Sequence, residues 1–384
     1  MSKKLLLCTI GAQGSIGTTI ASGIEAMKTN PRCVLDYLIT NKNDSVLKDF
    51  YSEFEVAGWD LRGNSFFDSF LKNKPIKTET FNSVAEGLEK KKIFASPDFN
   101  QPMFEQVNQV RNNIQELKTK YKGYDLVAAN ILPASEINFE ECNPLALDEI
   151  MKLSGKKYKD LAYLIACVQE GVPFVNFTPN PIELDAIIKL AEENNTTLCG
   201  RDGKTGQTYF KVVLASAFRA RNLIVKGWYS TNILGNDDGK NLDDEKVAKN
   251  KIRQKSVVLD RALGYPVKDH IVHIDYYAPR GDNKEANDVI DFNGFLDEEM
   301  SMRVNILCKD SVLAAPMIID MSIISAYLKY FHGKKGIMTE ISFFYKLPVG
   351  SETKNATFES QMKILEDVIR CEGEYSNLKN PVEA

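Results

Sequence analysis

Three charged side chains stand where an apolar stretch gives way to a helical pattern, in the segment LCGRDGKTGQTYFKVV (198–213). Asp202 and Lys204 could bind an anion or exchange protons with a ligand, and Thr205 could add a hydrogen bond. Taken alone, such a segment is more often a solvated loop. Whether this segment belongs to a functional site therefore has to be judged from the rest of the chain.

A second basic segment, KNKIRQK (249–255), places Lys251 and Lys255 four residues apart on one face of a helix. Like charges at this spacing repel, and a phosphate bound between them would relieve the repulsion; a solvated helix face is the alternative. The loop NILGNDDGKNL (232–242) is rich in amides and carboxylates. Asn and Asp also form ordinary turns, and the spacing is wrong for an EF-hand calcium loop.

Gly11, Gly14 and Gly17 occupy a turn between a buried strand and a helix. Small residues there let backbone N–H groups and the helix N-terminus approach a pyrophosphate. The spacing is GxxGxxG rather than GxGxxG, so a turn that only packs a helix onto a strand is the alternative. In the loop AGWDLRG (57–63), Asp60 could accept hydrogen bonds from a ribose. The alternative there is a surface loop anchored by its tryptophan.

These residues must be positioned by strands and helices. The first forty residues predict a βαβ unit whose second strand is CVLDYLIT (33–40), followed by Asn41 and Asp44 rather than by a carboxylate at the strand end. Apolar runs predict further buried strands, and helical spacing predicts helices between them. The strands are expected at 5–10, 124–132, 172–179 and 196–200, and the helices at 104–121, 160–171 and 181–194. This alternation predicts an α/β fold with a Rossmann-like, doubly wound parallel sheet.

After about residue 208 the pattern changes to longer, partly alternating strands, which are typical of a sheet covered on one face. They are expected at 223–234, 268–278 and 301–309, and a buried helix at 310–331 would return to the first domain. The sequence therefore predicts two domains. A dinucleotide-binding domain comprises 1–208 plus 313–384, and an inserted α+β domain comprises 209–312.

Composition limits the partners. Of the 384 residues 43% are hydrophobic and 26% charged, with a net charge of −4, which argues against a nucleic-acid or anionic membrane surface. Seven cysteines without a CxxC pair argue for a reducing compartment. Three histidines argue against a zinc site or a histidine triad. No signal peptide and no run suited to a membrane span are expected, so the protein is predicted to be cytoplasmic.

Five longer segments, taken in order, resemble the myo-inositol-1-phosphate synthase family: GRDGKTGQT, NILGNDDGKNL, KIRQKSVVLD, DHIVHIDYYAPRGDNK and CKDSVLAAPMIIDM. The match runs from Gly11 to about Lys346. The resemblance implies an NAD-dependent enzyme of inositol biosynthesis that cyclises glucose 6-phosphate. C5 is oxidised with NAD, a C6 proton is removed, an intramolecular aldol step closes the ring, and the same NADH reduces the product. Lysines would supply the cationic and acid–base groups that such chemistry needs.

The resemblance also implies roles for residues that match the family's motifs. The catalytic set is Lys251, Lys255, Lys346, Asp202, Asp310 and Lys204. The cofactor-binding set is Gly11, Gly14, Ser15, Ile16, Gly17, Asp60, Ala129, Asn130, Thr178, Asn180, Asp202, Asn236 and Asp238. The substrate-binding set is Thr205, Asn232 and Lys284. A homotetramer formed through the sheet of the inserted domain is implied. Family members differ in needing a divalent or a monovalent cation, and the sequence does not decide between them.

One position departs from the family pattern. Alignment on PRGDNK puts Asp275 where the family usually carries an active-site lysine, and a carboxylate there would repel a substrate phosphate or alkoxide. Two alternatives follow. The same chemistry could act on another hexose phosphate such as fructose 6-phosphate, or the protein could be an NAD-binding regulatory subunit without turnover. Retention of Lys251, Lys255 and Lys346 disfavours the silent subunit.

Overall fold

The computed structural model describes residues 3–61, 65–73, 81–135, 137, 139–153, 156–235, 258–350 and 357–378. The chain divides into two compact units. The first unit comprises Met1–Gly203, Ala315–Lys354 and Lys363–Ala384, and the second comprises Lys204–Ala314 and Asn355–Met362. The prediction placed 209–312 in the inserted domain and 313–384 in the first, whereas the second unit runs from Lys204 to Ala314 and also takes in Asn355–Met362.

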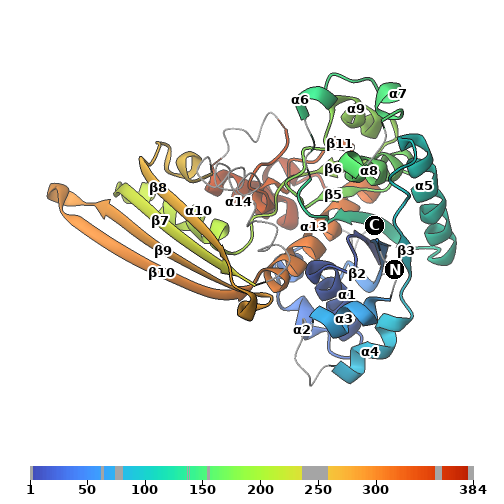
Figure 1. Ribbon diagram of the computed structural model, residues 1–384, viewed down its shortest axis with the longest axis horizontal. Coiled ribbons are helices and arrows are strands. Elements are labelled where there is room, and N and C mark those ends of the chain that lie inside the picture. The colour runs from blue at the N-terminus through green and yellow to red at the C-terminus, as the bar shows by residue number, and fades with distance from the viewer. Residues whose placement is uncertain are drawn as a thin grey trace. The chain divides into compact units, whose positions relative to one another are not determined.

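A seven-stranded parallel sheet forms the centre of the first unit (Figure 1). Its strands are β1 (Lys3–Ile10), β2 (Tyr51–Asp60), β3 (Ile93–Ala95), β4 (Asp125–Asn130), β5 (Phe174–Asn176), β6 (Thr197–Cys199) and β11 (Gly336–Ile337). They lie in the order β11-β6-β5-β4-β1-β2-β3, which from β3 to β6 is the 3-2-1-4-5-6 order of a Rossmann fold. The predicted doubly wound sheet is confirmed. Chain order reverses between β1 and β4, where such folds bind their ligands beyond the strand ends.

Helices cover both faces of this sheet because the crossovers on the two sides of β1 run in opposite directions. On one face, α5 (Met103–Lys120), α8 (Lys159–Gln169) and α9 (Asp185–Glu193) share an apolar core with Leu6 and Ile10 of β1. The crossover from β1 to β2 contains α1 (Ser15–Met27). The remaining helices of this unit are α2 (Arg32–Leu35), α3 (Phe66–Asn73), α4 (Phe81–Glu89), α6 (Phe139–Cys142) and α7 (Leu147–Ile150). The helix α14 (Phe358–Arg370) begins in the second unit and ends in the first.

The strand predicted at 33–40 is wrong. This segment forms α2 and a 3-10 turn, η1 (Ile39–Asn41). The backbone N–H groups of Ile39 and Thr40 donate to the carboxylate of Asp320 at 3.1 and 3.0 Å. Asp320 lies about 280 residues further along the chain, so a distant side chain decides this local conformation. The second strand of the unit is β2 instead.

The loop predicted at 57–63 is also wrong over its first residues, because 57–60 form the end of β2. Trp59 is 1% exposed, and its indole N–H donates to Asn113 Oδ1 at 3.0 Å. It is therefore a core residue and does not anchor a surface loop. Asp60 is the last residue of the strand, so a carboxylate does end the second strand.

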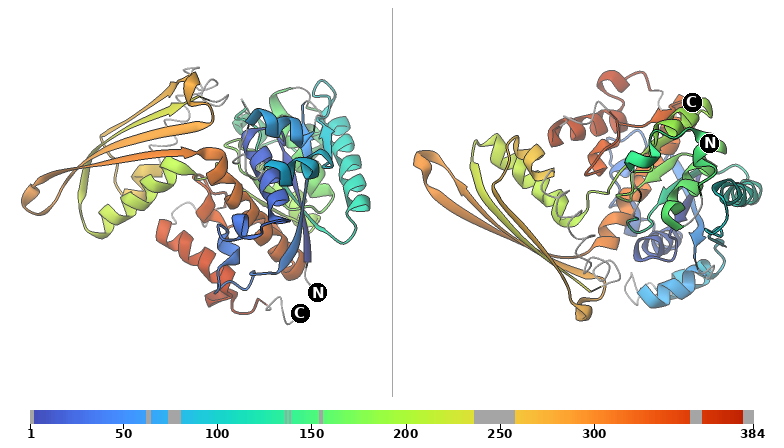
Figure 2. Two further views of the ribbon diagram at one scale, coloured as in Figure 1. Left: turned by 90° about the horizontal axis from the view of Figure 1, so that it is seen from below. Right: turned by 45° about the horizontal axis from the view of Figure 1, so that its top comes forward.

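The second unit contains a mixed four-stranded sheet in the order β10-β9-β7-β8. Its strands are β7 (Ile224–Leu234), β8 (Asp269–Tyr276), β9 (Asn283–Asn293) and β10 (Glu299–Lys309). One face is covered by α10 (Gly206–Ala220) (Figure 2), through a core that includes Phe218, Trp228 and Ile290. The predicted inserted α+β domain is confirmed. The strand β9 was not among the predicted strands, because its polar sequence NKEANDVID resembles a loop.

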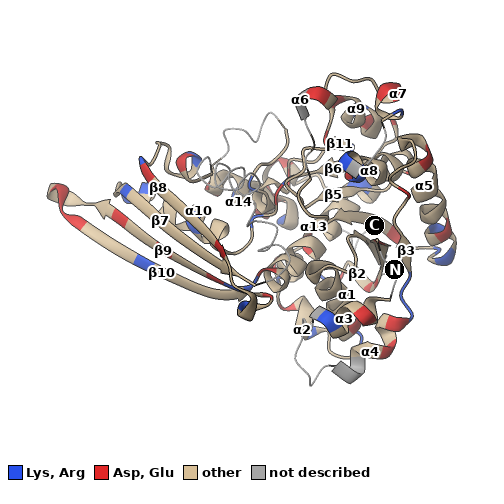
Figure 3. Cartoon of the chain, viewed as in Figure 1, with Lys and Arg blue, Asp and Glu red and all other residues tan. Residues whose placement is uncertain are grey.

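Charged side chains of both signs are interspersed over the ribbon (Figure 3), in keeping with the small net charge of −4. The helix α13 (Asp310–His332) is long and apolar enough to cross a membrane by length and composition. However, 78% of the most apolar 18-residue stretch of this helix is buried inside the protein, which is the environment of a core helix.

Candidate active site

Three glycines shape the turn after β1. Gly11 adopts φ +94°, a conformation that other residues rarely adopt. Gly14 precedes α1 and provides no side-chain cap. A Cβ at Gly17 would lie 2.5 Å from the carbonyl oxygen of Ala12, so only glycine allows the helix to approach the turn this closely. The uncapped helix begins with Ser15, Ile16 and Gly17. Such an N-terminus offers free backbone N–H groups to a phosphate.

Asp60 lies beside this turn. Its Oδ2 accepts a hydrogen bond from the backbone N–H of Gln13, and its Oδ1 accepts one from that of Leu61, both at 2.8 Å. An acidic residue that follows the glycine turn at this place in a Rossmann unit binds the ribose hydroxyls of a dinucleotide. The glycine turn and Asp60 therefore fit NAD, the cofactor expected from the sequence.

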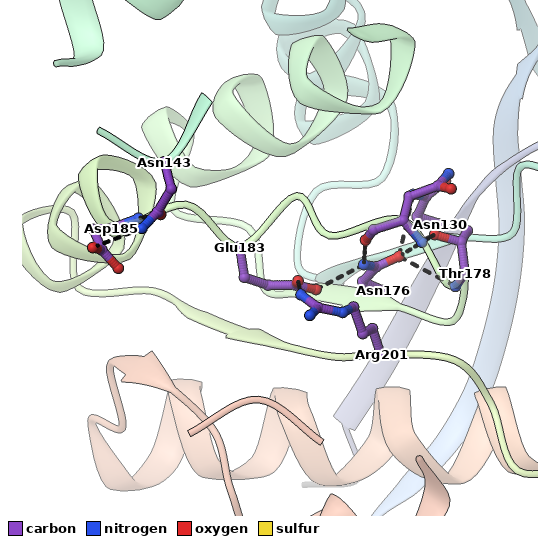
Figure 4. Close-up of polar contacts among 8 residues, drawn as sticks. Asn130, Asn143, Asn176, Thr178, Glu183, Asp185 and Arg201 are labelled. Carbon is purple, nitrogen blue, oxygen red and sulfur yellow. Dashed lines mark hydrogen bonds and ion pairs between the residues drawn. The ribbon is translucent and has the colours of Figure 1, made fainter. Parts of the chain in front are cut away.

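Several predicted cofactor residues lie in a buried network at the carboxyl ends of β4 and β5 (Figure 4). The amide groups of Asn130 and Asn180 donate to Asp160 Oδ2 at 2.7 and 2.8 Å. The hydroxyl of Thr178 donates to Asn176 Oδ1 at 2.7 Å. None of these five side chains is more than 3% exposed. They therefore hold the loops at this edge of the sheet in place; Ala129, also predicted, is fully buried within β4.

Sequence reasoning missed the carboxylates of this network. Burial raises the pKa of Asp160, while the amides of Asn180 and Asn130 act in the opposite direction. Glu183 accepts a hydrogen bond from Asn176 and lies 3.1 Å from Arg201; its burial raises its pKa, and Arg201 counteracts the rise. The signal available for Asp160 was a lone acid at the start of the apolar helix DLAYLIACV.

Asp202 and Lys346 form an ion pair within the first unit. The backbone N–H of Lys346 donates to the carbonyl of Asp202 at 2.8 Å, and the N–H of Asp202 donates to that of Thr178 at 2.7 Å. Lys346 Nζ lies 2.6 Å from Asp202 Oδ1, with side chains 15% and 10% exposed. Asp202 also adopts φ +62°, a conformation that clusters at functional sites when the residue is not glycine. An ammonium group and a carboxylate at this distance form a charge-assisted hydrogen bond, and both side chains are of types that serve as general acids or bases.

Lys204 is a buried amine in the second unit. Its side chain is 4% exposed, and Nζ lies 3.4 Å from Gln361 Oε1 and 5.4 Å from the ring centre of Phe358. Burial lowers the pKa of this amine to about 7. A group that titrates near neutral pH is well suited to accept and return a proton.

We expect the variant Lys204→Met to be more stable than the wild type at pH 6, by on the order of 2–4 kcal/mol. The lysine is protonated in both states there, and folding must desolvate its charge. The unfolded chain binds more protons than the folded one between pH 7 and the ordinary lysine pKa, so wild-type stability rises across that range. The advantage of the variant should therefore shrink by pH 10. Urea unfolding at both pH values measures it.

Lys226→Met, at an exposed position of β7, is the control and should show no pH-dependent difference. An advantage of Lys204→Met that is equal at both pH values would contradict the effect of burial on Lys204.

Of the other predicted residues in the second unit, those that the structure describes lie near the start of α10 and α13. Lys284 Nζ lies 2.9 Å from Asp310 Oδ2. Thr205 precedes α10 and makes no side-chain cap. A Cβ at Gly206 would lie 2.9 Å from Asp310 Oδ1, so this glycine makes room for the carboxylate. Asn232, on β7, is 1% exposed. Asn236, Asp238, Lys251 and Lys255 lie outside the described residues.

Asp275 is exposed on β8, where it pairs with Ile233. Its neighbour Ile274 pairs with Asn232. Because side chains alternate along a strand, the carboxylate of Asp275 points to the face of the sheet opposite Asn232. This placement gives no support to the expected repulsion of a substrate bound near Asn232.

A buried cluster on the covered face of this sheet was missed. Lys211 Nζ lies 2.8 Å from His270 Nε2 and 3.8 Å from Asp288 Oδ1, and Lys211 is 2% exposed. Burial lowers the pKa of Lys211 to about 8, and Asp288 acts in the opposite direction. Within the described part of the chain, no group of three or more His, Cys, Asp or Glu side chains could hold a metal ion.

The fold and these clusters define the class of protein to which the chain belongs. It is a Rossmann-like α/β protein with an inserted sheet domain and with buried lysines, Lys204 and Lys211. Comparison with known proteins narrows the class. The family model for myo-inositol-1-phosphate synthase matches residues 206–311. Inositol-3-phosphate synthase 1 of Bacteroides thetaiotaomicron is 32% identical over 385 aligned residues, which cover 90% of each chain. The chain belongs to the myo-inositol-1-phosphate synthase family, so it is expected to be an isomerase-type enzyme of inositol biosynthesis.

Two solved structures share its fold. The inositol-3-phosphate synthase of Caenorhabditis elegans superposes with a TM-score of 0.84 at 19% identity, covering 96% of this chain and 86% of that one. A myo-inositol-1-phosphate synthase-related protein of Thermotoga maritima superposes with a TM-score of 0.75 at 21% identity, covering 94% and 98%. The resemblance found in the sequence is confirmed at the level of family and fold.

Proposed function

We propose that the protein converts glucose 6-phosphate into an inositol phosphate with NAD as a cofactor that is regenerated in each turnover. The glycine turn and Asp60 would hold NAD, which would supply reversible hydride transfer at C5 of the sugar. The observation that carries the proposal is the sheltered Asp202–Lys346 pair, found in a chain whose glycine turn and Asp60 suit a dinucleotide.

The protein's own residues would bind the cofactor and move protons. The N-terminus of α1 would bind the pyrophosphate and Asp60 the adenosine ribose, while Asn130, Thr178 and Asn180 would keep the loops beyond β4 and β5 in place. Lys346 would donate a hydrogen bond to the developing oxyanion and move a proton with the help of Asp202. Lys204, with a pKa of about 7, would serve as a second proton carrier. Lys251, Lys255, Lys284, Asp310, Thr205, Asn232, Asn236 and Asp238 are proposed as further site residues on the family resemblance.

One assay separates this function from the two alternatives. The purified protein is incubated with NAD and either glucose 6-phosphate or fructose 6-phosphate, and products are followed by NMR. We expect an inositol phosphate from glucose 6-phosphate without net NADH. A carbocycle formed from the ketose alone would point to the changed substrate. NAD binding without any product from either sugar would point to the regulatory subunit.

We also propose a homo-oligomer, a tetramer by family resemblance. On the face of the sheet opposite α10, Tyr229 and Ile271 are register partners and are 44% and 46% exposed. Exposed apolar side chains on an extended sheet face suit contact with a second copy of the chain. Light scattering should give a multiple of 43.2 kDa; a monomer at micromolar concentration would refute the proposal.

A further inference from the structure

Asp288 is the centre of a buried hydrogen-bond path in the second unit. Its Oδ1 accepts from the indole N–H of Trp228 at 2.8 Å and from the hydroxyl of Ser230 at 2.5 Å. Its Oδ2 accepts from Gln207 Nε2 at 3.0 Å. Gln207 Oε1 then accepts from Asn232 Nδ2 at 2.7 Å. All five side chains are at most 4% exposed, so water does not compete for these bonds.

The direction of every bond follows from Asp288. An ionised carboxylate only accepts, and an indole N–H only donates. Gln207 must therefore turn its NH₂ group toward Asp288, which leaves its carbonyl oxygen facing Asn232. Asn232 must therefore donate to Gln207 Oε1 from its own NH₂ group. Its carbonyl oxygen, Oδ1, is thereby left over.

That leftover oxygen points to a ligand. Asn232 Oδ1 is buried, and no hydrogen-bond donor of the described residues contacts it. Buried polar atoms nearly always have a partner in folded proteins. Asn232 begins the segment NILGNDDGKNL, which the family resemblance places near the substrate.

We propose that Asp288 is a positioning residue that fixes the orientation of the Asn232 amide, so that a carbonyl oxygen is offered to a hydroxyl group of the sugar phosphate. The inference rests on the proposed function and adds a specificity element to it. The site would select a ligand with a hydrogen-bond donor at this point, because an acceptor would face an acceptor.

The variant Asp288→Asn tests the direction of the path. Trp228 and Ser230 still require an acceptor, so the new amide must turn its NH₂ group toward Gln207. Gln207 and Asn232 then both flip, and Asn232 offers NH₂ instead of oxygen. We expect the KM for glucose 6-phosphate to rise about tenfold or more, with a smaller change in kcat and with NAD affinity unchanged.

Two further variants keep the test independent of folding. Ser230→Ala removes one donor from Asp288 Oδ1 but leaves the path from Oδ2 intact, so its KM should stay within about threefold of wild type. The double variant Asp288→Asn, Asn232→Asp should recover most of the lost KM. The carboxylate that it introduces on β7 accepts from the flipped Gln207 and again presents an oxygen to the ligand. The proximity of Lys211 to Asp288 cannot explain such a recovery, since the double variant does not restore the carboxylate beside Lys211.

The outcomes decide between the proposals. An unchanged KM in Asp288→Asn, or no recovery in the double variant, overturns the positioning role while wild-type turnover upholds the proposed function. A wild type that forms no inositol phosphate refutes the function instead. Neutron diffraction then decides the path directly. Deuterium on the Gln207 nitrogen facing Asp288 and on the Asn232 nitrogen facing Gln207 supports it, and the reverse arrangement overturns it.

Discussion

Replacing Lys346 with methionine is expected to lower turnover of glucose 6-phosphate by about 10³-fold or more while changing NAD affinity less than threefold. Methionine keeps the length of the side chain but removes the ammonium group that lies 2.6 Å from Asp202. The proton carrier and the hydrogen-bond donor for developing negative charge are then both lost. The glycine turn and Asp60, which are proposed to bind NAD, are untouched. Steady-state kinetics and calorimetric titration with NAD measure the two effects.

Two controls separate chemistry from stability. Lys90→Met removes a lysine that is also ion-paired, to Glu86, but 71% exposed, and it should leave turnover unchanged. Lys346→Met also leaves the largely buried carboxylate of Asp202 without its ion-pair partner, which destabilises the fold. The double variant with Asp202→Asn should regain stability without regaining activity. Turnover within tenfold of wild type in Lys346→Met would refute the catalytic assignment.

The second large effect is expected from alanine at Gly17. The new Cβ would lie 2.5 Å from the carbonyl oxygen and 2.8 Å from the carbonyl carbon of Ala12, and backbone atoms cannot turn aside as a flexible side chain can. The start of α1 must therefore move away from the glycine turn. We expect NAD affinity to fall by about 100-fold, and stability to fall by about 1–3 kcal/mol. Titration with NAD and thermal unfolding measure both.

The same helix provides a matched control. Gly23 lies in the interior of α1, and a Cβ there would meet only Val34 Cγ2, at an ordinary 3.5 Å. Gly23→Ala should stabilise the protein by about 0.5–1 kcal/mol, because alanine favours the helix more than glycine does. NAD affinity should be unchanged. Equal behaviour of the two variants would show that close packing of the turn and helix does not matter for the cofactor.

Much of the first unit was predictable from local patterns. Continuous apolar runs identified β4, β5 and β6, and helical spacing identified α5, α8 and α9, because buried parallel strands and amphipathic helices differ in period and length. The failure at 33–40 has a definite cause. Its apolar residues suit a strand, but Asp320 binds the backbone N–H groups of Ile39 and Thr40. No local window contains that information.

In the site too, some features follow from local sequence and others from contacts between distant residues. The family, the glycine turn and the candidate residues Asp202, Lys204 and Lys346 were all accessible from the order of amino acids, because motifs are runs of neighbouring residues. Folding in three dimensions placed Asp60 at a strand end, paired Lys346 with Asp202 across 144 residues, and turned Asp275 away from Asn232. It also joined Gln207, Asn232 and Asp288 into one path. None of this could be predicted locally, because the direction of a hydrogen bond and the shift of a pKa depend on which groups share a buried volume, and distant parts of the chain supply those groups.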